Sequence, residues 1–191
     1  MNFQKLLLTS ILGISISTHS LAAQSYTDQE VKQIAINAIK TVGGKLKHTL
    51  GQKVKEGGLE SAANFCALEA TKLAKEASKS LPKGVTIKRI TNKPRNVLSQ
   101  ATIEQLKVLN QLETKMKNGK LPKLFVKKIS DNHFQVYKPL TVSKKCLNCH
   151  GDNNTRNKNA YKVITENYPQ DKAINYKLGD LRGAFLVNII K

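Results

Sequence analysis

Apolar residues recur at helical spacing through the first part of the chain, from Val31 to Val54. This period predicts a long amphipathic helix. Thr27 and Glu30 have the form of a capping box at its start. Gly43-Gly44 is expected to kink the helix and Gly57-Gly58 to end it. A helix of this length could serve as a stalk or as the contact of a dimer; otherwise the protein is a monomer.

A second helix is predicted over residues 59–79, with Cys66 at the centre of its apolar face, and a third from Ile103 to Met116. Other segments alternate between apolar and polar residues, which predicts strands. They are residues 85–91, 124–129, 134–137 with a continuation over 139–142, and 183–190. Residues 152–175 are polar and are expected to form a loop with at most one helical turn. Helices followed by a mostly antiparallel sheet indicate the α+β class.

Residues 1–23 have the three parts of an export signal. Lys5 supplies the positive charge, residues 6–16 the apolar core, and Ala22 or Ala23 the small residue at the cleavage site. The apolar run is too short to span a bilayer. We expect cleavage to leave one soluble periplasmic domain over residues 24–191, without a transmembrane segment. Retention as an uncleaved anchor is the alternative.

The run Cys146-Leu147-Asn148-Cys149-His150 has the C-x-x-C-H form that is typical of the attachment site of a c-type haem. Two thiols at this spacing can form thioethers with the two vinyl groups of one porphyrin. The next side chain, His150, is then held over the iron as an axial ligand, because neutral imidazole suits iron. One covalent haem c is therefore the expected cofactor.

The two cysteines have three other interpretations: a redox dithiol, half of a zinc site, or a disulfide. A thioredoxin-type dithiol needs a βαβ context, which the pattern lacks. A zinc site needs a second pair of ligands, and the other candidates, Cys66, His48 and His133, are isolated in the sequence. Export also favours haem, since c-type haem is attached on the exported side in bacteria.

Cys66 has no cysteine partner if Cys146 and Cys149 are both bonded to haem. A buried free cysteine usually packs as a small hydrophobe, whereas an inward thiol in an oxidising compartment could ligate iron. The pattern leaves both roles open. Met116 lies on an apolar helix face and suits core packing, and His133, beside a turn, is a weaker candidate ligand. His48 lies among lysines and is expected to be solvated.

The chain carries 32 Lys and Arg against 13 Asp and Glu, a formal net charge of +19, and loss of the signal would remove only Lys5. This excess favours acidic partners, which are an acidic electron-transfer protein, anionic lipid headgroups or polyanions. An acidic redox protein or a signalling protein is the expected partner. The lysines are scattered, so a uniformly solvated basic surface is an equal alternative. No nucleic-acid partner is expected, because an exported chain without a recognisable binding module does not suit one.

Several features occur in an order that resembles a known family. They are the helix with Cys66, the segment with Arg89, Arg95-Asn96 and Glu104, the run Tyr137-Lys138-Pro139-Leu140, the run from Cys146 to Gly151, and Gly179-Asp180 with Gly183. The family is that of the single-haem, PAS-like periplasmic domains, formerly a domain of unknown function, which occur alone or as sensor regions of histidine kinases and cyclases. The resemblance covers nearly the whole mature chain. It implies a PAS-like antiparallel sheet with long N-terminal helices.

The resemblance also implies His/Cys axial ligation, with His150 and Cys66 as the iron ligands. Arg89 and Arg95 are then candidate partners of the haem propionates, since Arg binds carboxylates bidentately; both could instead be solvated surface arginines. The family pattern has Pro, Asn and Pro at three positions of the following loop. They are occupied here by Val97, Ser99 and Ala101, so a less constrained loop is expected.

A thiolate ligand lowers the reduction potential of a haem. The sequence therefore favours a monohaem c-type cytochrome that transfers electrons at low potential and is not an enzyme. The alternative is a haem-based sensor of redox state or of diatomic gases, which would act through a partner protein. A haem peroxidase would need a distal acid–base group, and the sequence offers none that we can name.

Overall fold

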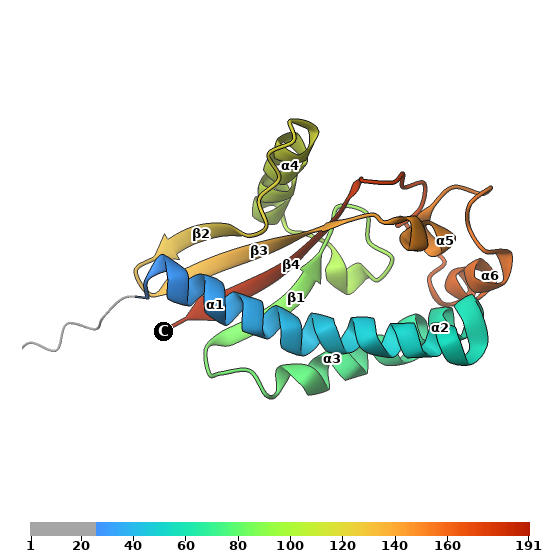
Figure 1. Ribbon diagram of the computed structural model, residues 1–191, viewed down its shortest axis with the longest axis horizontal. Coiled ribbons are helices and arrows are strands. Elements are labelled where there is room, and N and C mark those ends of the chain that lie inside the picture. The colour runs from blue at the N-terminus through green and yellow to red at the C-terminus, as the bar shows by residue number, and fades with distance from the viewer. Residues whose placement is uncertain (1–25) are drawn as a thin grey trace, which may run out of the picture.

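The computed structural model describes residues 26–191, so the expected export signal at residues 1–23 lies outside the described residues. The described part is α+β, as predicted: an N-terminal helical hairpin, a four-stranded antiparallel sheet, and further helices around the C-x-x-C-H run (Figure 1). Within residues 26–191, no helix is both long enough and apolar enough to cross a membrane.

The predicted capping box opens the N-terminal helix. The Thr27 amide donates to the Glu30 carboxylate at 2.7 Å, and the Glu30 amide donates to the Thr27 hydroxyl at 3.3 Å. The helix then runs as α1 (Asp28–Ile39), a π-helical segment η1 (Lys40–Gly44) and α2 (Lys45–Asn64). The irregularity expected at Gly43-Gly44 is thus a π turn. Gly43 also lies against the ring of Phe185, which an added Cβ would approach to 3.0 Å.

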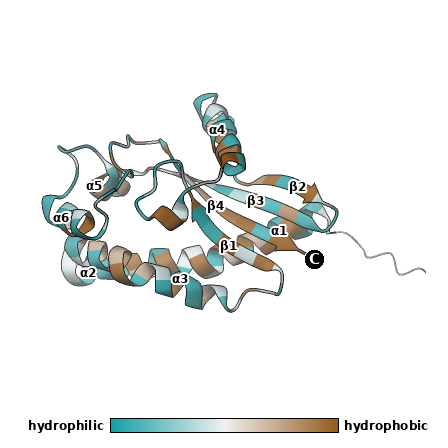
Figure 2. Cartoon of the chain, turned by 180° about the vertical axis from the view of Figure 1, so that it is seen from behind, coloured by the Kyte–Doolittle hydropathy of each residue, from teal (hydrophilic) through white to brown (hydrophobic). Residues whose placement is uncertain are grey.

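The predicted break at Gly57-Gly58 is confirmed. Gly58 has φ +68°, in the left-handed region that favours glycine, and both residues have non-helical backbone angles. The chain turns back there, so that the next helix packs along the first (Figure 1). Polar and apolar stretches alternate along both arms, as in amphipathic helices (Figure 2).

The returning helix covers residues 59–78, close to the predicted 59–79, but one segment of it is π-helical, which the sequence did not predict. After α2 ends at Asn64, a second π-helical segment, η2 (Phe65–Glu69), precedes α3 (Ala70–Ser78). A π turn holds one more residue than an α turn and is often found at functional sites. Cys66 lies within this π turn.

The sheet consists of β1 (Val85–Ile90), β2 (Phe125–Ser130), β3 (His133–Thr141) and β4 (Leu181–Ile190), all antiparallel, in the order β1-β4-β3-β2. The predicted continuation of the hairpin through Pro139 is confirmed. β4 begins two residues earlier than expected, at Leu181. Gly183 within it has φ +127°, and an added Cβ would collide with the carbonyl of Ile90.

Alternate side chains of the sheet enter two separate cores. On one face, α1 covers Val85, Phe134, Val136, Val187 and Ile189. On the other face, α4 (Ile103–Lys117) covers Ile90, Tyr137, Ala184 and Leu186. Arg89 has the same strand parity as Val85 and therefore lies on the α1 face, toward the helical hairpin.

The expectation that residues 152–175 form a loop with at most one helical turn is wrong. α6 covers Lys158–Asn167, and the side-chain oxygen of Asn157 caps it by accepting a hydrogen bond from the Ala160 amide at 3.0 Å. Its buried side chains are Ala160, Val163 and Ile164, which pack against Ala63 of α2. This helix depends on a surface that α2 supplies, and its short apolar stripe gave a weak signal in the sequence.

Candidate functional site

The C-x-x-C-H run follows β3 and folds as two short helical turns, η4 (Lys144–Cys146) and α5 (Leu147–His150). Residues three apart in such turns lie on the same side, so Cys146 and Cys149 share one face. Both thiols are free and half-buried, as is that of Cys66. Cys149 packs against the small core between α2 and α6, and Cys146 packs against Val142, Ala173 and Tyr176.

His150 is held in one tautomer. Its Nδ1 lies 2.8 Å from the carbonyl oxygen of Ala173. Because a carbonyl only accepts, Nδ1 carries the proton and Nε2 keeps its lone pair, which is the arrangement of a metal-ligating imidazole. Burial and the charges of Arg95 and Arg182 lower the pKa of His150 well below its usual value. The neutral form, which is the ligating form, is thus favoured.

Three further contacts fix the backbone of the run. The amide of Asn157 donates to the Asn148 carbonyl at 2.8 Å, and the amide of Tyr176 donates to the His150 carbonyl at 2.9 Å. Gly151 is packed so closely that an added Cβ would overlap the Thr155 hydroxyl and lie 2.8 Å from a backbone oxygen of α5. The glycine after the histidine is therefore a steric requirement of this turn.

Cys66 reaches the same region from the helical hairpin. The hydroxyl of Tyr168, just after α6, donates to the Cys66 carbonyl at 3.2 Å. Tyr168 and Cys149 both pack against the small core that joins α2 to α6. Burial raises the pKa of the Cys66 thiol, the proximity of Cys149 raises it further, and Arg95 and Arg89 lower it. The Cys66 thiol thus lies within electrostatic reach of the C-x-x-C-H run.

Arg95 connects the run to the segment that follows α6. Its Nε donates to Asp171 at 3.0 Å, its Nη2 lies 3.0 Å from the same carboxylate oxygen in an ion pair, and Nη2 donates to the Cys149 carbonyl at 2.6 Å. The two charged side chains are only 12% and 3% exposed. The positive charge of Arg95 is therefore matched by a carboxylate of the protein itself. Its predicted role at the propionates stays a prediction.

Arg89 is placed differently. Burial lowers its pKa, and the nearby thiols of Cys66 and Cys146 and the hydroxyl of Tyr176 oppose this effect. Its Nε is buried without a hydrogen-bond partner in the described structure. No ion pair within residues 26–191 includes it. Arg89 is thus a half-buried side chain with a buried Nε, and no carboxylate among the described residues pairs with its charge.

Sequence reasoning missed Arg182, which is only 6% exposed and completes the cluster. Its Nη1 donates to the Thr91 hydroxyl at 3.1 Å and to the Lys93 carbonyl at 3.3 Å, while its Nε has no partner in the described structure. The guanidinium lies 5.1 Å from the ring centre of Tyr176, whose hydroxyl is also buried without a partner. The sequence did contain one indication of its importance: Arg182 lies between Gly179 and Gly183, in a segment that carries the family resemblance.

The loop after β1 is held more firmly than its missing prolines suggest. The Asn96 side chain caps the short 3-10 turn η3 (Val97–Ser99) by accepting from the Leu98 amide at 2.9 Å. The amide of Thr91 donates to the Ser99 carbonyl at 2.9 Å, and the Ala101 amide donates to the Thr91 carbonyl at 3.0 Å. These bonds connect the loop to the end of β1.

The weaker candidates lie away from the run. His48 is exposed on α2, as expected. His133 opens β3, whereas the run follows the end of that strand, which places the two roughly 26 Å apart along the strand. Met116 is in the last turn of α4, the helix that covers the other face of the sheet.

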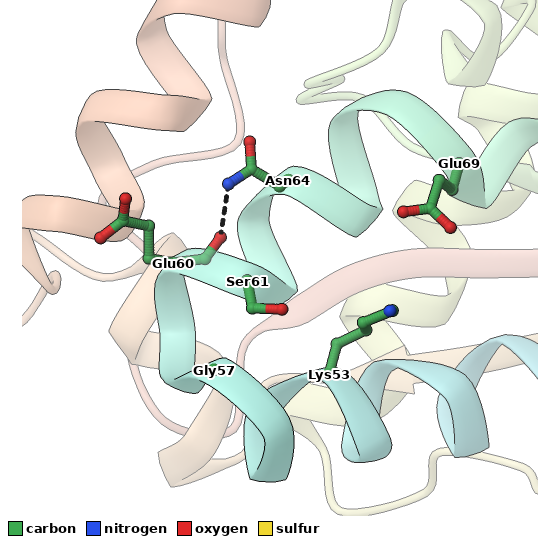
Figure 3. A pocket seen from close by; sticks show the side chains of 6 residues that line it. All are labelled: Lys53, Gly57, Glu60, Ser61, Asn64 and Glu69. Atoms are coloured by element: carbon green, nitrogen blue, oxygen red, sulfur yellow. Dashed lines mark hydrogen bonds between the residues drawn. The ribbon is translucent and has the colours of Figure 1, made fainter.

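A recess of about 350 Å³ lies at the bend of the helical hairpin (Figure 3). It is lined by Lys53, Gly57, Glu60, Ser61, Asn64 and Glu69. Only polar residues and glycine line it, and none of them belongs to the cluster around His150. Within residues 26–191, no group of three or more His, Cys, Asp or Glu side chains is arranged to hold a metal ion.

The donor set can be tested against the predicted haem. Two thiols share a face, one imidazole offers Nε2, and a third sulfur lies within electrostatic reach. Two arginines without carboxylate partners, each with a buried Nε, lie beside them. Sulfur and imidazole suit haem iron, and guanidiniums suit the carboxylates on the porphyrin edge. The residues present therefore fit a covalently held haem.

Comparison with known proteins agrees with this arrangement. The structure is similar to the solved structure of the cyanobacterial haem protein Tll0287, with a TM-score of 0.57 and 25% identity over 87% of this chain and 98% of that chain. No curated protein matches the sequence. A family model described as Tll0287-like matches residues 13–189. Since that match covers nearly the entire sequence, the chain belongs to the Tll0287-like family.

Proposed function

We propose that this protein is an exported, periplasmic monohaem c-type cytochrome that transfers electrons at low potential, with His150 and Cys66 as the axial ligands of the iron. Membership of the Tll0287-like family and similarity to a haem protein support haem binding. The observation that carries the finer proposal is the link through Tyr168 between Cys66 and Cys149, which are 83 positions apart in the sequence. The Tyr168 hydroxyl donates to the Cys66 carbonyl, and the Tyr168 side chain packs against the same small core as Cys149. Cys66 itself lies in a π turn.

In this proposal the residues have separate tasks. The thiols of Cys146 and Cys149 would hold the porphyrin through two thioethers, each equivalent to addition of one S–H across one vinyl double bond, without net oxidation. The haem supplies a one-electron couple at its iron. His150 offers Nε2 because Ala173 keeps the proton on Nδ1. Cys66 offers a second donor, whose electron release holds the potential low.

The first experiment tests covalent attachment. The protein is exported in a strain competent in cytochrome maturation, purified, and denatured in alkaline pyridine, where the haem spectrum reports the number of thioether bonds. The wild type should retain one haem per chain through denaturation. Cys146→Ser and Cys149→Ser should each lose one thioether, and the double variant should release its haem. A colourless wild type with free thiols at both positions would refute the proposal.

The second experiment tests Cys66. Cys66→Ala should convert the oxidised iron from low spin to high spin, because it removes the sixth ligand. Cys66→Met should keep a low-spin iron but raise the reduction potential, since thioether ligation favours the reduced state. Leu68→Ala is the matched control, because Leu68 lies in the same π turn and is 68% exposed. Unchanged spectra in Cys66→Ala would exclude Cys66 as a ligand.

One observation favours the second candidate, a redox or gas sensor that acts through a partner protein. A π turn differs from an α turn by one residue, so its relaxation to α-helix would rotate the thiol by about 100° about the helix axis. Cys66 lies in such a turn and could leave the iron on reduction. Carbon monoxide binding to the reduced protein separates the two functions: binding supports the sensor, and absence of binding supports the electron carrier.

A further inference from the structure

The arginines around His150 fall into two classes. Arg95 is paired with Asp171 and also donates to the carbonyl of Cys149, so its charge and donors are used inside the protein. Arg89 and Arg182 have no carboxylate partner within residues 26–191. Each has a buried Nε that donates to no atom of the described structure.

These two guanidiniums belong to neighbouring segments, because Arg182 donates to the hydroxyl of Thr91, two residues after Arg89. Arg182 has a lowered pKa because of burial and because of the charge of Arg89, and Arg95 adds a smaller effect in the same direction. The groups that face Arg89 from neighbouring elements are Cys66, Tyr176, Arg95 and Cys146. Arg182 and the Lys93 ammonium both contact the ring of Tyr176. The cluster therefore contains four cations, and Asp171 is the carboxylate that pairs with one of them.

Burial of unpaired like charges is costly, and proteins normally compensate it with ions of opposite sign. The missing partner must carry negative charge, accept hydrogen bonds at two positions and lie beside His150. Two carboxylates on one rigid ligand meet these conditions, because each guanidinium can form a bidentate pair with one carboxylate.

We propose that Arg89 and Arg182 bind the two carboxylates at the edge of the porphyrin, and that Arg95 is a positioning residue that holds the C-x-x-C-H run against the segment containing Asp171. This inference rests on the proposed haem binding and revises the assignment made from the sequence. The buried hydroxyl of Tyr176, which has no partner in the described structure, is a third donor toward the same carboxylates.

The test is the reduction potential of the holoprotein as a function of pH. A carboxylate paired with arginine keeps a low pKa and stays ionised, so the wild-type potential should be constant between about pH 5 and pH 8. In Arg89→Gln and Arg182→Gln one carboxylate loses its partner and titrates in this range. Its affinity for protons rises on reduction, so the potential should become pH-dependent. Arg89→Lys and Arg182→Lys should partly restore a constant potential.

Lys88→Gln and Lys177→Gln are the matched controls, because each removes one exposed positive charge close in sequence to the two arginines. They should leave the potential independent of pH. Arg95→Gln should reduce haem retention and thermal stability without adding a pH dependence. The inference is overturned if neither Arg89→Gln nor Arg182→Gln makes the potential pH-dependent, or if Arg95→Gln alone does. A wild type without haem would overturn the proposed function as well, which distinguishes the two failures.

Discussion

At the scale of single residues, the site depends on how tightly the C-x-x-C-H run is enclosed. The Ala173 carbonyl selects the tautomer of His150, and the Arg95 guanidinium holds the carbonyl of Cys149. Gly151 allows the turn to close against Thr155. These contacts fix the backbone of the run and the ring of His150, and the proposal gives these residues the task of holding the haem.

Gly151→Ala is expected to destabilise the protein. The added methyl group would overlap the Thr155 hydroxyl and press on the Leu147 carbonyl at 2.8 Å, and overpacking of this kind typically costs about 1–3 kcal/mol. Gly44→Ala is the control, because an added Cβ there has no neighbour within 4 Å and alanine favours a helix by roughly 1 kcal/mol. Urea unfolding of both holoproteins measures the difference. Equal midpoints for the two variants would contradict this account.

At the scale of elements, α6 joins the two halves of the site. Its apolar face packs on α2, and Cys149 packs against the same core. Tyr168, immediately after the helix, holds the π turn that contains Cys66. α6 therefore sets the position of one proposed iron ligand relative to the two cysteines that we propose form thioethers.

Tyr168→Phe removes the hydroxyl that donates to the Cys66 carbonyl at 3.2 Å. We expect a loss of about 1 kcal/mol in the free energy of unfolding, the usual value of one such hydrogen bond. We also expect a measurable high-spin fraction in the oxidised spectrum, because the π turn is less firmly held. Tyr161→Phe is the control, since Tyr161 contacts Arg156 through its ring. A high-spin fraction equal in both variants would count against the coupling of Tyr168 to Cys66.

At the scale of the whole molecule, the formal net charge of +19 is the dominant feature. A charge of this size attracts acidic partners and accelerates their approach. The cations at the site are half-buried or buried, whereas most lysines are exposed. We therefore expect the exposed lysines, and not the arginines at the site, to act on the approach of an acidic partner.

Electron exchange with an acidic redox protein should slow as salt increases. Between about 0.01 M and about 1 M salt the Debye length falls from roughly 30 Å to roughly 3 Å, which screens the attraction. Stopped-flow reduction of the haem by an acidic flavoprotein should therefore lose at least tenfold in rate constant over this range. A neutral small-molecule reductant serves as the control and should react at a nearly constant rate. A salt-independent rate with the flavoprotein would show that the surface charge plays no part in encounter.

The sequence by itself determined the features that depend on neighbouring residues. Capping at Thr27, the break at Gly57-Gly58, the strand periods and the C-x-x-C-H run all act within one or two turns of chain. Local hydrogen bonding, backbone freedom and side-chain alternation decide such features, so a linear pattern is sufficient to predict them.

Only the tertiary structure decided which distant groups meet. α6 is stable because α2 covers its short apolar face, and the π turn places Cys66 near a run 80 residues later. Arg95 and Arg182 have similar sequence surroundings, with Asn96 after the first and Gly183 after the second. Only the folded structure shows that Asp171 pairs with Arg95, whereas the positive charge of Arg182 has no carboxylate partner among the described residues. Charge pairing and burial depend on contacts between remote segments, and a linear pattern carries no record of them.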